Sequence, residues 1–373
     1  MAQTNKTPVA ILLASPQTER LLRLFSLPEF VEKFLPTVVD IRTIKLSLFS
    51  RLKARGHRVL HAVETADWQE RALCEHIVKE YLGKIELVVG LDSQISILDR
   101  LSRHPSGSKR CFAIQMGSHP RFYERDIVRD RPTKVTLLSW GSREYNNYSR
   151  NGLYPEHIIA VGSLMRALAD RQNSAARVTQ DPYDLCIVSQ FRPVPDPSIN
   201  VSDSAHAESQ TMPALLEVFE PAIKKLNLKV VVALRAQKFL ATSIKAGDEK
   251  LCFEQNLDAP FTFTASGDLY SSYSAVLQSR ISVGRNSSLL FECMASSSRI
   301  IFVNPTLRTE FNPPSDWPYG YVRPSAEDIE SILKMLLNMS EEQYSFSTKK
   351  IAAKYCEHEI DTLSNIAQLL SVS

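Results

Sequence analysis

The stretch Ser282-Val-Gly-Arg-Asn-Ser-Ser-Leu-Leu-Phe-Glu-Cys-Met-Ala295 is followed closely by the apolar run Arg299-Ile-Ile-Phe-Val303. This order predicts a short strand, a turn of small polar residues after Gly284, a helix and then a β-branched strand. The first N–H groups of a helix have no partner within it and the helix dipole favours anions, so such a turn suits phosphate. An ordinary N-cap formed by the serine pair is the alternative interpretation.

The same alternation of strand-like and helix-like segments extends along the chain. We expect strands at 9–14, 36–41, 57–63, 85–90, 110–115, 135–139, 158–161, 185–189, 228–234 and 261–264, besides the two in the opening stretch. Strands that alternate with helices indicate parallel sheets covered on both faces. A polar stretch at 171–182 divides the series, which predicts two domains, 1–170 and 171–373.

The second half also carries a long polar segment and several helical patterns. Residues 194–212 are rich in Ser, Pro, Asp and Asn, and we expect a long loop there. A helix is predicted from Pro213 to Leu226. Two terminal helices are predicted at 326–337 and 341–370, both within the second domain.

Composition places the chain among ordinary globular proteins. It has 373 residues, of which 44% are hydrophobic and 23% charged, with a net charge of +3. A nucleic-acid-binding domain usually has a concentrated basic face, so we predict no nucleic-acid partner. No stretch approaches the ~18 apolar residues of a membrane span, and no secretory leader is visible.

Cysteine and histidine spacing gives no sign of a metal centre. The six cysteines are scattered without Cys-x-x-Cys pairs, which favours reduced thiols in a cytoplasmic protein. The eight histidines show no ligand spacing either. We therefore predict that the protein is cytoplasmic and that it holds neither a metal ion nor a cofactor.

Polar residues just after the strands are the candidate site residues, because ligands of open parallel sheets bind beyond the carboxyl ends of the strands. In the first half these candidates are Asp40, Asp92, His119 and Glu144. In the second half they are Ser189, Gln190, Arg235, Gly284, Arg285, Asn286, Ser287, Ser288 and Glu292.

Three segments resemble a known family. The opening stretch resembles the donor-binding segment of GT-B glycosyltransferases. The segments Leu137-Leu-Ser-Trp-Gly-Ser-Arg-Glu144 and Tyr154-Pro-Glu-His-Ile-Ile-Ala-Val-Gly-Ser163 resemble the end of the N-terminal domain in bacterial surface-polysaccharide glycosyltransferases. Similar segments occur in UDP-N-acetylglucosamine 2-epimerases and CDP-glycerol glycerophosphotransferases. Gln115-Met-Gly117 lies where such proteins often have a Gln-His-Gly turn.

The resemblance implies a GT-B-like α/β fold, in which two Rossmann-like domains place parallel sheets across a cleft. It implies that residues 1–170 bind the acceptor and residues 171–373 bind the nucleotide-sugar donor. The expected activity is metal-independent transfer of a sugar from a CMP-, UDP- or GDP-linked donor to a surface polysaccharide, lipopolysaccharide or capsule. The acceptor would be a glycan or a lipid-linked glycan, and a lipid-linked acceptor would bring the protein to the periphery of the inner membrane.

The resemblance also implies roles for the candidate residues. The 284–288 turn and Arg235 would stabilise the leaving phosphate, and Glu292 would bind a ribose hydroxyl. Asp92 is the preferred general base, and the other three residues of its half are the further candidates.

Two departures from the family pattern leave other interpretations open. Many relatives carry Arg-Pro-His-Pro where this chain has Arg235-Ala-Gln237, so only the arginine matches. Arg285 is an added cation that fits a diphosphate or a carboxylate, although a surface salt bridge would explain it equally well. A nucleotide-sugar 2-epimerase and a non-catalytic GT-B-like module that binds a glycan or a partner are the alternative functions.

Overall fold

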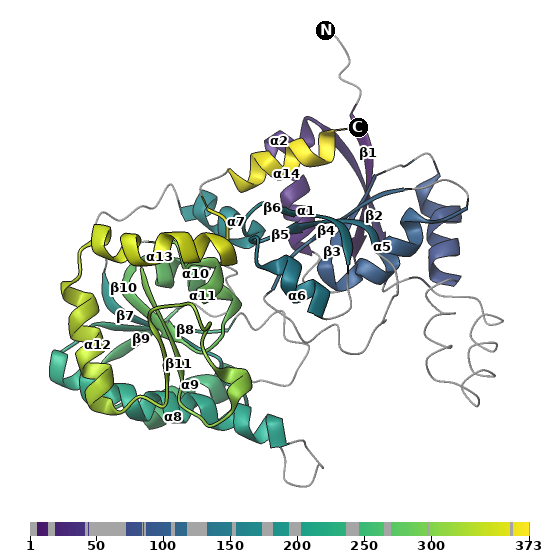
Figure 1. The fold of residues 1–373 in the computed structure, drawn as a ribbon. Coiled ribbons are helices and arrows are strands. Elements are labelled where there is room, and N and C mark those ends of the chain that lie inside the picture. Colours follow the sequence, from purple (N-terminus) through teal and green to yellow (C-terminus); the bar gives the residue numbers. More distant parts are fainter. Residues whose placement is uncertain are drawn as a thin grey trace. The chain divides into compact units, whose positions relative to one another are not determined.

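The structure of the protein is a computed structural model. It describes residues 6–13, 19–41, 44, 72–83, 85, 87–105, 109–117, 133–150, 154–173, 182–193, 203–235, 246–264, 270–296, 298–358 and 361–372. The chain forms two compact units: unit 1 contains Met1–Ala167 and Glu357–Ser373, and unit 2 contains Leu168–Cys356. In each unit, strands lie side by side with helices packed around them (Figure 1).

Unit 1 is built on a parallel sheet whose described strands have the order β2-β1-β3-β4-β5-β6. The strands are β1 (Thr7–Leu13), β2 (Phe34–Asp40), β3 (Leu87–Leu91), β4 (Arg110–Ile114), β5 (Thr133–Ser139) and β6 (Pro155–Ala160). The helices are α1 (Glu19–Phe25), α2 (Pro28–Val31), η2 (Val78–Leu82), η3 (Asp92–Gln94), α5 (Ile95–Ser102), α6 (Glu144–Arg150) and α14 (Thr362–Ser371). Among the described strands, the order reverses between β1 and β3.

The centre of this sheet is apolar on both faces. Ile11 and Leu12 of β1 and Val88 and Val89 of β3 are all fully buried, although successive side chains of a strand point to opposite faces. Burial on both sides is typical of parallel strands covered by helices. The predicted strand at 57–63 lies outside the described residues.

Unit 2 has a second parallel sheet, with the order β12-β11-β10-β7-β8-β9. Its strands are β7 (Tyr183–Val188), β8 (Val230–Ala233), β9 (Phe261–Phe263), β10 (Ser279–Gly284), β11 (Arg299–Asn304) and β12 (Gly320–Val322). Its helices are α8 (Asp203–Leu226), α9 (Ala246–Asn256), α10 (Ser271–Leu277), α11 (Ser288–Glu292), η6 (Thr309–Phe311), α12 (Ala326–Asn338) and α13 (Glu341–Tyr355). Helix α7 (Leu164–Asn173) carries the chain from unit 1 into unit 2.

When the strands of unit 2 are numbered one to six along the chain and the sheet is read from β9 to β12, their order is 3-2-1-4-5-6, that of a dinucleotide-binding fold. The reversal falls between β7 and β10, which pair in parallel with Ile281 opposite Leu185 and Val283 opposite Ile187. All four of these side chains are fully buried. The predicted strands of this half are therefore confirmed, and the short strand β12 was not predicted.

The expected loop at 194–212 is wrong from Asp203 onward, because α8 begins there and continues through Pro213 and Pro221. Proline usually marks a helix start because it lacks the N–H group. Here the apolar face continues past Pro213, with Met212 and Leu215 both buried, and burial of this face outweighs the lost hydrogen bond.

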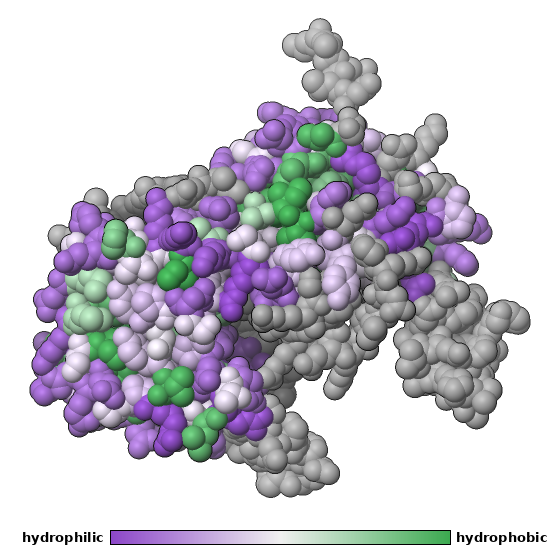
Figure 2. Space-filling model, in the orientation of Figure 1, coloured by the Kyte–Doolittle hydropathy of each residue, from purple (hydrophilic) through white to green (hydrophobic). Residues whose placement is uncertain are grey.

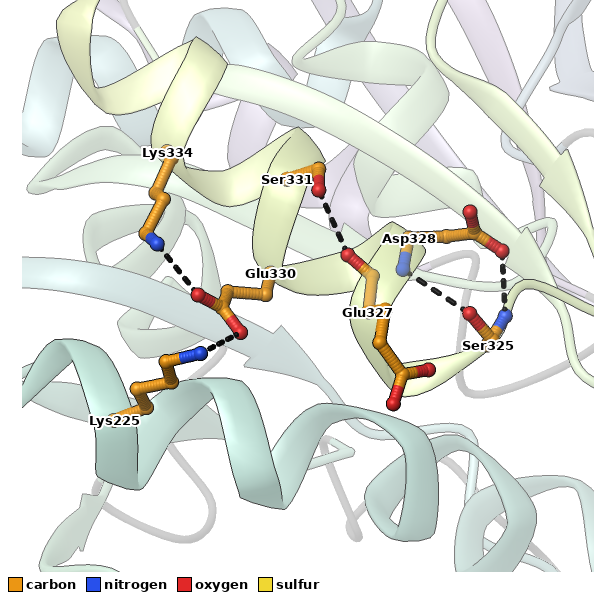
Figure 3. Close-up of polar contacts among 7 residues, drawn as sticks. All are labelled: Lys225, Ser325, Glu327, Asp328, Glu330, Ser331 and Lys334. Carbon is orange, nitrogen blue, oxygen red and sulfur yellow. Dashed lines mark hydrogen bonds and ion pairs between the residues drawn. The ribbon is translucent and has the colours of Figure 1, made fainter.

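Helix α12 begins with a capping box and forms an ion pair with α8 (Figure 3). Ser325 accepts the N–H of Asp328, and the Asp328 carboxylate accepts the N–H of Ser325 in return. One turn later Glu330 pairs with Lys334 on its own helix and with Lys225 of α8, at N–O distances of 2.5 and 2.8 Å. These exposed ion pairs fix the register of α12 against α8 more than they stabilise the fold.

The C-terminal segment departs from the predicted organisation. The pattern at 341–370 predicted one helix in the second domain, but α13 ends at Tyr355 and α14 belongs to unit 1. The return is held by polar contacts within unit 1: the Glu357 N–H donates to the Trp140 carbonyl at 2.7 Å, and Arg110 Nη2 donates to the Leu370 carbonyl at 3.2 Å. These contacts join residues far apart in sequence, so local pattern could not predict them.

The surface of the described residues is mainly hydrophilic on the face shown in Figure 2, where hydrophobic residues form small patches. Exposed large apolar side chains such as Phe346 of α13 and Leu307 of the loop after β11 lie far apart in the sequence. Within the described part of the chain, none of the helices combines the length and apolar character that a bilayer span requires.

Gly162 gives a test of the C-terminal return. Its φ is 84°, and an added Cβ would lie 2.5 Å from the Glu357 carbonyl oxygen and 2.6 Å from Thr362 Oγ1. We expect Gly162→Ala to weaken the docking of α14 by about 1–3 kcal/mol. Hydrogen exchange of the α14 amides should accelerate by roughly 5- to 150-fold.

The matched control is Gly247→Ala near the start of α9. A Cβ added at Gly247 meets nothing within 4 Å, so this change should leave exchange of the α14 amides unchanged. Equal exchange in the Gly162→Ala variant and the parent protein would show that the return does not depend on Gly162.

Candidate functional site

Unit 1 gathers its predicted polar residues where three neighbouring strands end. Leu91 pairs with Ile114, and Ile114 pairs with Leu138. The residues that follow, Asp92 after β3 and Gln115 after β4, therefore lie side by side at one edge of the sheet. This edge adjoins the reversal of strand order beside β1, where ligands of such sheets bind.

Asp92 is a buried carboxyl group held by hydrogen bonds at both oxygens. Its exposed fraction is 9%. Oδ2 accepts the hydroxyl of Tyr148 at 3.0 Å, and Oδ1 accepts the N–H of Ser93 at 3.0 Å. Burial raises the pKa of Asp92 to about 7, the charge of Glu144 adds to this, and the hydrogen bonds from Tyr148, Ser93 and Met116 oppose it.

Glu144 lies near Asp92 at the start of α6 and is also buried. Burial raises its pKa, while hydrogen bonds to Asn147 and Gln115 and the charge of Arg143 oppose the rise. A carboxyl group with a pKa near neutrality, as Asp92 has, can both accept and release a proton. The structure therefore brings two of the four predicted acid–base residues, Asp92 and Glu144, into one cluster.

Gln115 and Trp140 form the rigid support of this cluster, and each is 1% exposed. Gln115 Oε1 accepts the backbone N–H of Trp140 at 2.8 Å, and the Gln115 carbonyl accepts its indole N–H at 3.1 Å. Gln115 Nε2 donates to the Gly117 carbonyl at 3.1 Å. The amide thus joins the end of β4 to the end of β5 and fixes where α6 begins.

Of the other two predicted acid–base residues, Asp40 does not join this cluster. Asp40 ends β2, which pairs with β1 on the side away from β3. Two strand spacings separate it from the end of β3, which is about 10 Å. His119 lies outside the described residues. Tyr148 was not predicted, because no strand pattern precedes it and its role depends on the fold of α6.

Unit 2 gathers arginine side chains at the equivalent edge of its own sheet. Arg235 follows β8, Arg285 follows β10, and Arg192 follows β7. Burial lowers the pKa of Arg235 to about 10, and the charges of Arg192 and Arg285 lower it further, against Glu249 and Glu208. Positive groups that destabilise one another in this way attract an anion.

The geometry of these arginines limits how they can move. Arg235 Nη1 donates to the Phe191 carbonyl at 3.0 Å, and Arg192 Nε lies 3.3 Å from Glu208 Oε2. The Arg285 guanidinium carbon lies 3.9 Å from the centre of the Phe311 ring, a cation–π contact.

A buried carboxylate underlies this edge. Glu249 of α9 is fully buried; its Oε1 accepts the Arg235 N–H at 3.1 Å and also the Ser189 hydroxyl. The single hydroxyl proton of Ser189 is thus donated to Glu249, and the hydroxyl oxygen accepts the Phe191 N–H at 3.3 Å. Glu249 was not predicted as a site residue, because an acidic residue in a first helical turn is ordinary.

The turn after β10 has the predicted form, with Ser287 in the N-cap position of α11. The Ser287 side chain makes no capping hydrogen bond to the first turn of this helix. A Cβ at Gly284 would lie 3.0 Å from Leu290 Cδ1 and 3.3 Å from the Val188 carbonyl oxygen. The turn therefore packs tightly on β7, and Asn286 Nδ2 donates to the Asn312 carbonyl at 2.9 Å.

Helix α11 itself is short and ends at a buried carboxylate. It has 5 residues, so its dipole adds little and the charge for an anion comes from the arginines. Glu292 is 5% exposed, and its Oε2 accepts the Tyr273 hydroxyl at 2.8 Å. Glu292 is therefore neither a cap nor an exposed helix residue, and its predicted contact with a ribose stays a prediction.

Metal binding has no visible basis in the part of the chain that the structure covers. Among those residues, no group of three or more His, Cys, Asp or Glu side chains is placed to hold an ion. All six cysteines are buried thiols, and none of them forms a disulfide. The predicted absence of a cofactor stays a prediction.

Solved structures of other proteins share this fold. No protein-family model matches the sequence, and no curated protein matches it. The S. aureus protein MnaA, solved with UDP, superposes with a TM-score of 0.55 at 10% identity, covering 98% of each chain. The UDP-GlcNAc 2-epimerase of Methanocaldococcus jannaschii, solved with UDP-GlcNAc and UDP, gives 0.52 at 10% identity, covering 98% of this chain and 99% of the other.

These likenesses extend over nearly the whole chain in both directions. Together with the two parallel sheets, they show that the chain has the GT-B fold of two Rossmann-like α/β domains. The predicted fold class is thereby confirmed.

The buried carboxyl group of Asp92 predicts a definite pH dependence of stability. Its pKa is about 7 in the folded protein against an ordinary 3.8, so the folded state holds the proton more tightly. The contribution of Asp92 to the unfolding free energy is therefore greatest below pH ~4 and is lost as the pH rises to ~7. As the pH rises from ~4 to ~8, the unfolding free energy of Asp92→Asn, measured with urea, should increase by roughly 1–4 kcal/mol relative to that of the parent protein.

Asp258→Asn is the matched control. The neighbouring Lys224 lowers the pKa of this exposed carboxyl group, so its replacement should bring no gain with rising pH. Parallel stability curves for Asp92→Asn and the parent protein would contradict the raised pKa of Asp92.

Proposed function

We propose that the protein is a metal-independent glycosyltransferase that uses a nucleotide-sugar. The observation that carries the proposal is the gathering of Arg192, Arg235 and Arg285 where the strand order of unit 2 reverses. Ligands of doubly wound sheets bind at such a reversal, and guanidinium groups bind phosphate oxygens in pairs. The buried carboxyl groups of unit 1 supply the second requirement, a proton acceptor.

The donor half of the reaction needs stabilisation of negative charge on the leaving phosphate. Arg235 and Arg285 would supply it, with the hydroxyls of Ser287 and Ser288 at the turn. Close packing at Gly284 brings this backbone to the sheet edge, where a side chain would intrude. Gln190 and Asn286 border the same edge and would contact the nucleotide or the sugar.

The acceptor half needs a base for the attacking hydroxyl. Asp92 is suited to it, because a pKa of about 7 keeps a large fraction ionised at neutral pH while leaving it basic enough to take a proton. Glu144 sets the local charge and competes for the same proton. We propose a glycan or lipid-linked glycan of a surface polysaccharide, lipopolysaccharide or capsule as the acceptor. A lipid-linked acceptor would bring this cytoplasmic protein to the membrane periphery.

A 2-epimerase acting on a nucleotide-sugar is the second candidate function. It is favoured by the M. jannaschii enzyme, which shares the fold over the whole chain and binds UDP-GlcNAc. The same residues would serve it, since epimerisation at C2 also needs a proton acceptor and a phosphate site. A third possibility, a module that binds without catalysis, predicts binding and no turnover.

A nucleotide screen tests the donor site. Thermal shifts would be measured with CMP, CDP, UDP, GDP and dTDP on the parent protein and on Arg285→Ala and Ser287→Ala. A nucleotide at 100 times its dissociation constant should stabilise the parent by about 2.7 kcal/mol, and each variant should lose most of this.

Arg280→Ala is the control for this screen, because Arg280 lies at the opposite end of the same strand, paired with Asp184 at 3.4 Å. It should retain the nucleotide shift even if its own melting temperature falls. The absence of a shift with every nucleotide in the parent protein would refute the proposed donor site.

Product analysis separates the two enzymatic functions. The UDP-, GDP- or CMP-sugar of the nucleotide selected by the screen would be incubated with the protein, alone and with glycan acceptors. A glycosyltransferase releases the nucleotide and slowly releases sugar whose configuration at C2 is unchanged, whereas an epimerase yields the C2 epimer. Asp92→Asn should reduce either rate by 100-fold or more, and full activity of that variant would exclude Asp92 as the base.

A further inference from the structure

Tyr148 of α6 makes a direct contact with the carboxyl group assigned as the base. Its hydroxyl donates to Asp92 Oδ2 at 3.0 Å, and the side chain is only 2% exposed. Burial of a tyrosine hydroxyl requires a hydrogen-bond partner, and Asp92 is that partner here. The contact joins residues 56 positions apart, so it depends on the tertiary fold.

Tyr148 shares its helix with the second buried carboxyl group. Glu144 precedes it by four residues, which is one turn of α6. Among the described residues, Glu144 and Tyr148 are the titratable side chains that act on Asp92, and Ser93 and Met116 contribute backbone N–H groups. Helix α6 thus presents to Asp92 one group that opposes its ionisation and one that supports it.

We propose that Tyr148 is a positioning residue that holds Asp92 in the ionised, proton-accepting state and aims its remaining lone pair at the acceptor hydroxyl. The inference rests on the proposed function, in which Asp92 is the base. The three hydrogen bonds, from Tyr148, Ser93 and Met116, occupy three of the four lone-pair sites of the carboxylate. They leave one lone pair for the acceptor hydroxyl and restrain rotation of the carboxylate.

The proton balance of the step is simple. The acceptor O–H bond breaks and its proton passes to Asp92, while the oxygen forms a bond to the anomeric carbon. The bond from that carbon to the phosphate breaks, and the leaving phosphate keeps the electron pair. Tyr148 keeps its own proton throughout, because it donates a hydrogen bond and does not transfer the hydrogen.

Burial and the nearby Glu144 explain why such a residue is needed. Both raise the pKa of Asp92, burial more than the charge of Glu144, and without a counteracting donor Asp92 would be largely protonated at neutral pH. A tyrosine hydroxyl stabilises the ionised form without adding a cation. A lysine or arginine at position 148 would lower the basicity of Asp92 much further and weaken it as a proton acceptor.

The first test measures Asp92 directly and needs no substrate. The ¹³C-carboxyl titration of Asp92 would be followed by NMR in the parent protein and in Tyr148→Phe, with Asp92→Asn used to assign the signal. Tyr148→Phe keeps the ring and removes the donor, so the titration midpoint should rise by about one to two pH units. Tyr145→Phe on the same helix, at a side chain 54% exposed, should leave the midpoint unchanged.

The second test is the pH profile of kcat/KM for nucleotide release from the nucleotide-sugar selected by the thermal-shift screen. In Tyr148→Phe the acidic limb of the profile should move to higher pH, by as many pH units as the NMR midpoint. Loss of packing alone would lower the rate equally at every pH. Tyr145→Phe should reproduce the parent profile.

The outcomes separate the inference from the function on which it rests. An unchanged Asp92 midpoint in Tyr148→Phe overturns the inference, whatever the activity. A raised midpoint with a shifted acidic limb supports it. A raised midpoint together with full activity of Asp92→Asn overturns Asp92 as the base, and with it the catalytic role of Tyr148.

Discussion

Parallel pairing is the constraint on which the rest of this structure depends. In a parallel sheet every strand runs in the same direction, so the residues that follow the strands all emerge at one edge. Where the strand order reverses, the connections leave toward opposite sides and open that edge to a ligand. Unit 2 reverses between β7 and β10, and the described strands of unit 1 reverse between β1 and β3.

The edge of unit 1 carries carboxyl groups and the edge of unit 2 carries arginines, and in both units burial shifts the pKa of these groups. In unit 1, burial raises the pKa of Asp92 and Glu144 and so favours proton acceptance. In unit 2, burial and mutual repulsion lower the pKa of Arg235, and the buried Glu249 holds the backbone beneath it. The apolar strands provide this burial, because their side chains exclude water from both faces of each sheet.

Local pattern predicted the elements well where the physical signal is local. Strands β7 and β11 are built around the apolar runs 185–188 and 300–303, and the turn after Gly284 is formed by polar residues that favour turns. The pattern failed where burial outweighs propensity, as in α8, which continues through Pro213 and Pro221. It also missed α9, whose apolar residues have no clear period, and β12, which is only 3 residues long.

The candidate site divides in the same way. The sequence by itself determined the fold class and the strand ends that carry Asp92, Glu144, Arg235 and Arg285, because short apolar runs and turn chemistry are encoded locally. Only the tertiary structure decided which of these residues meet. It separates Asp40 from the end of β3 by one intervening strand and brings Tyr148 into contact with the Asp92 carboxyl group. It also buries Glu249 against Ser189 and the Arg235 backbone, and it places α14 in unit 1. Such contacts join residues far apart in the chain, and their energy depends on burial, which exists only once the sheets have formed.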